Sequence, residues 1–257
     1  MMHSEFRIYG DGSPVVLIPG FASKANSWGF QYRWLKRYFK VITFEIKGID
    51  ESGLAMRNCN LRAAVDYLSE ILASSGISKT ALVGSSMGAM AALEFARKYP
   101  EKVLSIIAVS LPVAYNATFG QLSEMISSCT ANEFSLKYIM PLFFSPAFVK
   151  HERFKIITDF FLPNGSSFSK EILSSQLGMI REWIESKRWV EGCQCPSLFI
   201  YGSEDQLVSK EEALRQLAPI FNKSEFKVID GAGHAVHIER YSIFNEILRD
   251  FLTRNNS

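Results

Sequence analysis

This sequence has few of the residues that build metal sites and disulfide frameworks. Its 257 residues include only four cysteines and four histidines. The cysteines are scattered, and Cys193-Gln194-Cys195 lacks both the spacing and the partner ligands of a zinc site. We therefore expect free thiols in a reducing compartment, no metal and no organic cofactor.

Excess charge and long apolar runs are equally scarce. The formal net charge is only +2, which gives no electrostatic case for binding nucleic acid. No uninterrupted apolar run approaches the roughly 18 residues of a membrane span. The first residues also lack the basic stretch and apolar segment of a secretory signal. We expect a cytoplasmic protein with no nucleic-acid partner and no membrane span.

The sequence does contain short apolar runs that alternate with helical stretches, the pattern of a mostly parallel sheet in an α/β protein. The runs are apolar at consecutive positions, as expected when helices cover both faces of a sheet. The predicted strands are Val15–Ile18, Val41–Ile46, Thr80–Val83, Leu104–Val109, Pro196–Tyr201 and Phe226–Ile229. The predicted helices are Ser27–Tyr38, Leu61–Ser74, Met87–Lys98, Lys210–Ile220 and Ile238–Leu252.

The strand rhythm stops after Leu111-Pro112 and resumes near Cys193. Between them lies a stretch that reads as helices and loops rich in aromatic residues, including Phe143 and Phe144. We therefore predict an α/β core of residues 1–111 and 193–257, interrupted by a helical cap of residues 112–192. The cap aromatics either form an apolar wall over a site or fill the cap's own core, and both interpretations stay open.

The sharpest motif is Gly84-Ser85-Ser86-Met87-Gly88, a G-x-S-x-G placed between a predicted strand and a predicted helix. The flanking glycines let the backbone turn sharply, so that a serine is exposed at the carboxyl end of the strand. Ser85 is a competitor, but only Ser86 has glycine two residues away on both sides. We predict Ser86 to be a nucleophile.

A serine nucleophile needs a base. In proteins with a G-x-S-x-G motif between a strand and a helix, the histidine base comes after the serine and the acid, so we expect it late in the chain. His234 follows the predicted strand Phe226–Ile229 on the glycine-rich stretch Gly231-Ala232-Gly233. Its imidazole can take the serine proton and return it. His237 is the one serious rival, although its place at the start of the last predicted helix favours a packing or capping role.

An acid must hold the imidazole in the useful tautomer. Asp205 fits best, because it lies just beyond the strand Pro196–Tyr201 and its side chain can approach a histidine on the next strand's loop. Glu204 and Asp230 are the alternatives, with solvent-exposed or turn-forming roles as their simpler explanation.

The predicted strand Val15–Ile18 ends in Pro19-Gly20-Phe21-Ala22. Its glycine permits the close backbone approach that an oxyanion-binding loop requires. The backbone amides of Phe21 and Met87 are therefore the candidate oxyanion donors.

With these residues in place, the chain resembles the α/β-hydrolase family, in which serine, acid and histidine follow in the order of Ser86, Asp205 and His234. The resemblance implies an eight-stranded, mostly parallel sheet with a helical cap inserted after the sixth strand. The compact form resembles small carboxylesterases, including the pimeloyl-acyl-carrier-protein methyl esterases, and enol-lactonases. Two features depart from the family. Pro19 stands where many relatives carry histidine. Many relatives also carry an aspartate and several glycines after the second core strand, where this chain reads Glu45-Ile46-Lys47-Gly48-Ile49-Asp50-Glu51-Ser52.

The predicted function is hydrolysis of a carboxylic ester with an apolar acyl group through an acyl-serine intermediate. Phe21, Phe143 and Phe144 are the predicted substrate-binding side chains, and an acyl-carrier protein is a further candidate partner. Two alternatives keep the same residues: a ligand-binding receptor or pseudoenzyme, and a lyase or carbon–carbon bond enzyme.

Overall fold

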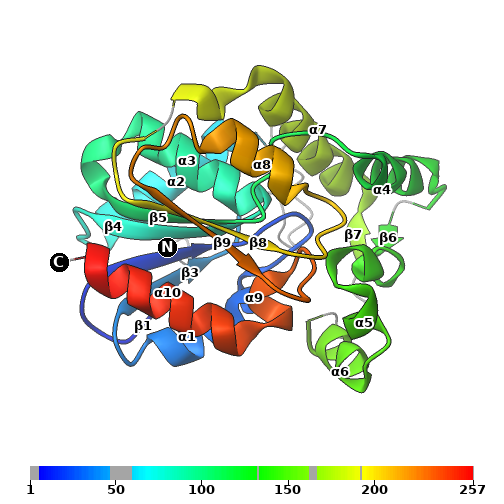
Figure 1. Cartoon of the computed structure of the whole chain (residues 1–257), viewed down its shortest axis with the longest axis horizontal. Coiled ribbons are helices and arrows are strands. Elements are labelled where there is room, and N and C mark those ends of the chain that lie inside the picture. Colours follow the sequence, from blue (N-terminus) through cyan, green and yellow to red (C-terminus); the bar gives the residue numbers. More distant parts are fainter. Residues whose placement is uncertain (1–5, 47–59, 132, 162–166, 192, 257) are drawn as a thin grey trace.

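The computed structural model describes residues 6–46, 60–131, 133–161, 167–191 and 193–256 (Figure 1). The departure noted from Lys47 to Ser52 therefore lies outside the described residues. No helix within these ranges is both long and apolar enough to cross a bilayer.

A seven-stranded sheet in the order β1-β3-β2-β4-β5-β8-β9 forms the centre of the fold. Only β1 runs antiparallel to its neighbour, and the other pairs are parallel. The strands are β1 (Phe6–Tyr9), β2 (Pro14–Ile18), β3 (Lys40–Phe44), β4 (Thr80–Ser85), β5 (Val103–Val109), β8 (Ser197–Gly202) and β9 (Ser224–Ile229). Every residue of the central strand β4 is buried, which explains its unbroken apolar run.

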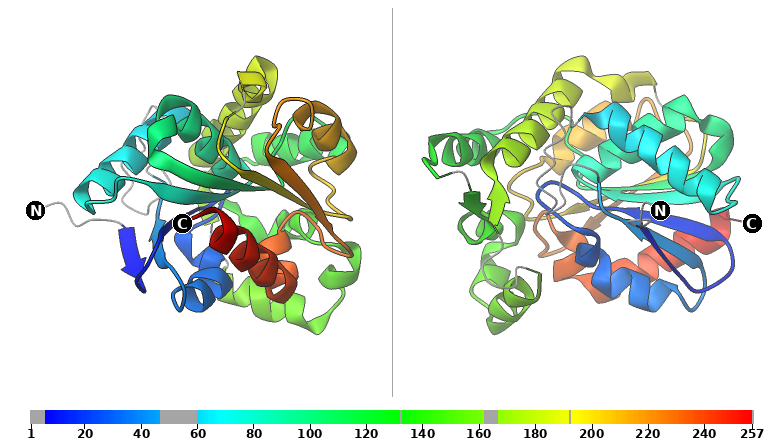
Figure 2. Two further views of the ribbon diagram at one scale, coloured as in Figure 1. Left: turned by 60° about the vertical axis from the view of Figure 1, so that its left-hand side comes forward. Right: turned by 180° about the vertical axis from the view of Figure 1, so that it is seen from behind.

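Helices cover both faces of this sheet (Figures 1 and 2). On one face lie α2 (Leu61–Ser74), α3 (Met87–Lys98) and α8 (Lys210–Leu217). On the other lie α1 (Gly29–Leu35) and α10 (Tyr241–Asn255), whose apolar side chains form a second core cluster. Short helical turns complete the core: η1 (Ala25–Trp28), η2 (Pro100–Lys102) and α9 (Val236–Glu239).

The prediction of a mostly parallel sheet flanked by helices is confirmed, but the strand count was wrong by one. The described sheet has seven strands and not eight, and the inserted segment follows its fifth strand and not its sixth. At one edge of the described sheet lies its antiparallel strand, β1. The closing helix predicted at Ile238–Leu252 is divided at Arg240 into α9 and α10.

Residues 112–192, which we call the cap segment, connect β5 to β8. Their elements are α4 (Ala117–Ser128), β6 (Glu133–Ser135), η3 (Leu136–Tyr138), η4 (Met140–Phe143), α5 (Pro146–Val149), α6 (Glu152–Phe161), β7 (Ser167–Ser169), α7 (Lys170–Ser186) and η5 (Arg188–Glu191). The antiparallel pair of β6 and β7 was not predicted. These strands are three residues each, too short for an alternating pattern to be recognised, and they pair Phe134 with Phe168. The treatment of the cap segment as a separate domain stays a prediction.

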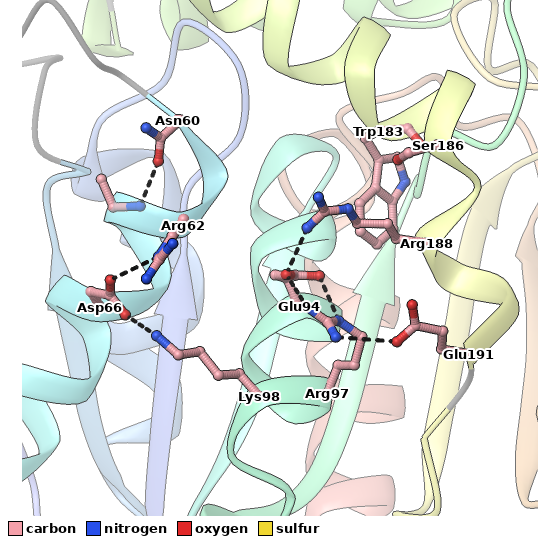
Figure 3. Close-up of polar contacts among 11 residues, drawn as sticks. Asn60, Arg62, Asp66, Glu94, Arg97, Lys98, Trp183, Ser186, Arg188 and Glu191 are labelled. Carbon is pink, nitrogen blue, oxygen red and sulfur yellow. Dashed lines mark hydrogen bonds and ion pairs between the residues drawn. The ribbon is translucent and has the colours of Figure 1, made fainter.

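The end of the cap segment is tied to the core by ion pairs around Glu94 of α3 (Figure 3). The nearly buried Glu94 carboxylate lies 2.7 Å from an Arg97 nitrogen and 3.0 Å from an Arg188 nitrogen of η5. Arg97 also lies 3.2 Å from Glu191 of η5. The Glu94 carboxylate of the core therefore binds the carboxyl-terminal end of the cap segment through Arg188.

Candidate active site

Ser86 occupies the turn between β4 and α3, in a backbone conformation that side chains rarely adopt. Its φ is 53° and its ψ is −114°. Its amide donates to the Val109 carbonyl at 2.7 Å, which fixes the turn against β5. Close packing explains the second glycine of the motif, because a Cβ at Gly88 would lie 2.3 Å from the Ile18 carbonyl oxygen. The strain at Ser86 thus persists because packed backbone on several sides holds the turn.

Asp205 and His234 meet through two short contacts. His234 Nδ1 lies 2.9 Å from Asp205 Oδ2 and 3.1 Å from Oδ1. A carboxylate only accepts hydrogen bonds, so Nδ1 carries the proton and Nε2 is left with its lone pair. The amides of Leu207 and Val208 donate to Asp205 Oδ1 at 2.9 and 3.0 Å. Both side chains are almost fully buried, at 1% exposure for Asp205 and 5% for His234.

The alternative acids lie elsewhere. Glu204 is exposed, and Asp230 is exposed and accepts a hydrogen bond from Ser203 Oγ at 3.1 Å. Neither contacts an imidazole through a hydrogen bond among the described residues, whereas Asp205 does so with both oxygens.

His237, the rival base, is buried against Trp28, with ring centroids 4.3 Å apart. Burial first, and then the charge of His234, lowers the pKa of His237 to about 3. A base with so low a pKa binds a proton poorly at neutral pH, so it suits general-base chemistry less well than a group that titrates near neutrality. Of the other two histidines, His151 accepts a hydrogen bond from the Arg153 amide in the cap segment, and His3 lies outside the described residues.

The two candidate oxyanion amides come from segments that touch at the Ser86 turn. Met87 is the first residue of α3, and the first N–H groups of a helix have no partner within it. Gly20 brings the other segment close, because a Cβ at this position would lie 2.8 Å from the Ser85 carbonyl oxygen and 3.5 Å from Ser86 Cβ. Only glycine allows the backbone before Phe21 to pass so near the serine.

Ser86 and His234 stand where two lobes of a cleft meet. The larger lobe encloses about 830 Å³, open space at its mouth included, and the smaller about 300 Å³. Phe21 and Phe143 line both lobes and stack with ring centroids 6.4 Å apart. Phe144 lines the larger lobe. All three aromatic residues predicted to bind substrate therefore line the cleft.

The lobes differ in chemistry. Besides the residues that they share, the smaller lobe is lined only by apolar side chains: Pro112, Phe119, Leu122, Ile180, Leu207 and Val208. The larger lobe carries polar groups: Ser23, Lys24, Asn26, Ser27, Ser85 and His237. Among the residues that the structure describes, no cluster of three or more histidine, cysteine or acidic side chains is placed to hold a metal.

Glu239 links the cap segment to the loop that carries His234, a role that was not predicted from the sequence. Its buried carboxylate accepts hydrogen bonds from the Gly233 amide at 2.9 Å, the Ser145 amide at 3.0 Å and the Ser145 hydroxyl. The Ala235 amide donates to the Phe143 carbonyl at 2.7 Å. In the sequence, the resemblance to the α/β-hydrolase family extends over Gly231–Glu239, which is similar to the family's glycine-histidine loop followed by a second histidine and a glutamate. The backbone of the cap segment is thus fixed to both sides of His234.

Comparison with known proteins agrees with this architecture. The family model described as alpha/beta hydrolase fold matches residues 13–138 and 156–241. The chain belongs to the α/β-hydrolase fold family. Within this family of hydrolases, the chain is 26% identical to a 2-hydroxy-6-oxononadienedioate/2-hydroxy-6-oxononatrienedioate hydrolase of Comamonas testosteroni, over 97% of this chain and 92% of the relative.

Other relatives bear different names. The chain is 27% identical, over 97% of its length, to the dihydrolipoyllysine-residue acetyltransferase component of the acetoin cleaving system of Pseudomonas putida, of which it spans 66%. Among solved structures, it is similar to a thermophilic esterase of Thermogutta terrifontis, with a TM-score of 0.82, 24% identity and coverage of 98% of this chain and 93% of the other. The enol-lactonase of Burkholderia xenovorans LB400 has a TM-score of 0.81 at 19% identity, with coverage of 96% and 95%. At these identities the structural similarity establishes the fold alone.

Proposed function

We propose that this hydrolase-family protein cleaves carboxylic esters through an acyl-serine intermediate, with Ser86 as nucleophile, His234 as general base and Asp205 as its orienting acid. One observation carries the proposal: a buried carboxylate holds the Nδ1 side of His234. The imidazole and a strained serine at a strand–helix turn also line one cleft. This is the arrangement that serine acyl transfer requires.

The proposed reaction begins when Ser86 Oγ attacks the ester carbonyl and its proton passes to His234 Nε2. The amides of Phe21 and Met87 stabilise the resulting oxyanion, and each such donor contributes on the order of 3 kcal/mol. His234 then protonates the departing alcohol, which leaves an acyl-Ser86. Water, deprotonated by His234, attacks this acyl group and releases the acid together with the free serine.

The two lobes support a substrate with unlike halves. Because they meet at Ser86, the acyl and alcohol parts of an ester would occupy opposite lobes, and the smaller lobe is apolar apart from Ser86 and His234. An apolar chain on one side of the ester and a more polar or larger group on the other therefore fit best. The ester substrate is our proposal, since the names of the relatives cover several reactions.

An acyl-carrier protein receives less support as a partner. Three basic side chains of the cap segment are paired with acidic ones: Lys155 with Asp159, Arg181 with Glu185 and Arg188 with Glu94 of the core. Docking an acidic partner would favour unpaired cations gathered on one face. This partner and the cytoplasmic location stay predictions.

The test is hydrolysis of a p-nitrophenyl ester series from acetyl to dodecanoyl by the native protein and by Ser86→Ala. We expect the variant to lose activity by at least about 10⁴-fold, with the fold intact by circular dichroism. Ser85→Ala compares the neighbouring serine, which also lines the larger lobe, and should stay within about tenfold of native because it leaves the nucleophile in place.

A fluorophosphonate should label native protein and Ser85→Ala, but not Ser86→Ala. A folded native protein with neither turnover nor label would contradict the esterase proposal and favour a receptor. Turnover of a non-ester substrate without a trapped acyl-serine would favour the lyase or carbon–carbon bond alternative.

A further inference from the structure

The loop that carries the Phe21 amide is held by acceptors from two distant segments. The Ala22 amide donates to Gln176 Oε1 at 2.9 Å. Three residues on, the Ala25 amide donates to the two Glu45 carboxylate oxygens at 3.1 and 3.0 Å. Glu45 belongs to the core just after β3, whereas Gln176 lies in α7 of the cap segment. The loop is thus fixed from the core at one end and from the cap segment at the other.

Ala22 is the strained point of this loop. Its φ is 51°, in the left-handed region that residues other than glycine seldom adopt. Such a conformation persists only where surrounding contacts hold it. The N–H that binds Gln176 belongs to the peptide group between Phe21 and Ala22, which is one peptide group after the one that carries the Phe21 N–H. The hydrogen bond therefore restrains the Phe21 amide through the φ and ψ angles of Phe21.

The two residues before Phe21 contribute no side-chain hydrogen bond to this loop. Pro19 has no backbone N–H and no polar side chain, although many relatives carry histidine at this place. Gly20 has no side chain at all. The acceptor from α7 therefore supplies a restraint that the local sequence does not.

Gln176 is an unusual residue for its position. It is completely buried, and its Nε2 has no hydrogen-bond partner among the described residues. Methionine would fill similar space without an unsatisfied amide nitrogen, so packing alone does not favour glutamine here. What glutamine provides and methionine lacks is the acceptor that meets Ala22.

We infer that Gln176 is a positioning residue for the oxyanion loop, so that the cap segment completes the catalytic machinery as well as covering the cleft. This inference rests on the proposed esterase function. When α7 is in place, the Phe21 amide is oriented toward the oxyanion, and when the Gln176 contact is lost, the loop relaxes from its strained conformation. A purely structural Gln176 would instead affect thermal stability and leave kcat unchanged.

The experiment compares native protein with Gln176→Met, which keeps the size and removes the acceptor, and Gln176→Glu, which keeps an acceptor oxygen. Gln216→Met is the matched control, because Gln216 of α8 bonds Glu212 and the Val113 carbonyl, away from the loop. We expect Gln176→Met to lower kcat about 10- to 100-fold with KM changed less than about threefold, as befits an interaction realised in the transition state. Gln176→Glu should recover at least part of kcat.

A second readout is specific to the oxyanion. A trifluoromethyl ketone is attacked by Ser86 Oγ, the proton passes to His234, and the resulting hemiketal oxygen binds in the oxyanion site. Gln176→Met should weaken this inhibitor by about the factor lost in kcat, and Gln216→Met should not. If Gln176→Met does not fold, Gln176→Asn replaces it, since asparagine keeps the amide but is too short to reach Ala22.

The outcomes separate the two proposals. A native enzyme that hydrolyses esters, with Gln176→Met equal to it in kcat and in inhibitor affinity, overturns the role of Gln176 alone. A lower melting temperature with unchanged kcat has the same meaning. A native protein without ester turnover or serine labelling overturns the proposed function and this inference with it.

Discussion

At the residue scale, the hydrogen bonds of Asp205 predict the behaviour of its amide variant. In Asp205→Asn, the Leu207 and Val208 amides still donate to Oδ1, which turns the new NH2 group toward His234. Two donors cannot face each other, so Nδ1 loses its proton and Nε2 holds one. We expect kcat to fall about 10⁴-fold with little loss of fold. Asp230→Asn, at an exposed acid, is the control, and equal loss in both variants would contradict the role of Asp205.

His237 predicts a pH dependence of stability. Burial lowers its pKa to about 3, whereas the unfolded chain binds this proton near pH 6.5. Stability from neutral His237 is thus present above pH 6.5 and declines by about 1.4 kcal/mol per pH unit as the pH falls from there toward 3. His237→Phe removes this decline, so its stability relative to native should rise between pH 7 and 5. Urea unfolding at the two pH values measures it, and an unchanged difference would contradict a buried, neutral imidazole.

At the scale of elements, the contact between α3 and β2 predicts the effect of a single methyl group. In Gly88→Ala, the new Cβ would meet the backbone oxygens of Ile18 and Pro19 at 2.3 and 2.6 Å. Backbone cannot yield as a side-chain tip can, so we expect a loss of at least about 2 kcal/mol in the free energy of unfolding. Gly120→Ala in α4 meets nothing within 4 Å and should stabilise by up to about 1 kcal/mol. Chemical unfolding measures the free energy of unfolding of both variants. Equal changes in Gly88→Ala and Gly120→Ala would contradict the predicted clash at Gly88.

The elements also show what one sequence can reveal. Leu61–Ser74 and Met87–Lys98 were predicted at their observed bounds. In the structure Asn60 caps the first helix, and the second ends at Tyr99, directly before Pro100. The strands of the parallel sheet were found because buried strands are continuously apolar. The positions of Ser86, Asp205 and His234 followed from turns at strand ends, although their catalytic roles stay predictions.

Other features leave no local trace. The contact between Ala22 and Gln176 joins residues 154 positions apart, and that between Ser145 and Glu239 spans 94. Periodicity and turn chemistry act over a few residues, so neither contact could be predicted without the tertiary structure. The strand count was misjudged because it came from the family resemblance and not from this sequence.

At the scale of the whole molecule, Glu94 predicts how firmly the cap segment is joined to the core. Burial opposes its charged form, but the hydrogen bonds and charges of Arg97 and Arg188 prevail and lower the pKa of Glu94. Glu94→Gln should cost about 1 to 3 kcal/mol of unfolding free energy at pH 7. Its effect should shrink as the pH falls below the usual glutamate value near 4.3, where the unfolded chain takes up the proton, and should vanish at the lower pH at which native Glu94 is protonated.

Asp250→Asn is the matched control for this prediction, because Asp250 pairs with Arg249 at the surface and is 62% exposed. Exposed pairs of this kind contribute at most about 1 kcal/mol. Thermal or urea unfolding at pH 7 and 4 compares the variants. A Glu94→Gln effect no larger than that of Asp250→Asn would contradict the importance of the link.

The pairing of β5 with β8 has a consequence for the order of folding. Val109 pairs with Ile200, although the whole cap segment separates them along the chain. Contacts between such distant residues form slowly, because a long loop must close before they give any stabilisation. We therefore expect β8, which leads to Asp205, and β9 to join the sheet late. By then α3 and the strands beside Ser86 have already formed. During refolding we expect the circular dichroism of helices to return first and the reactivity of the serine to appear last.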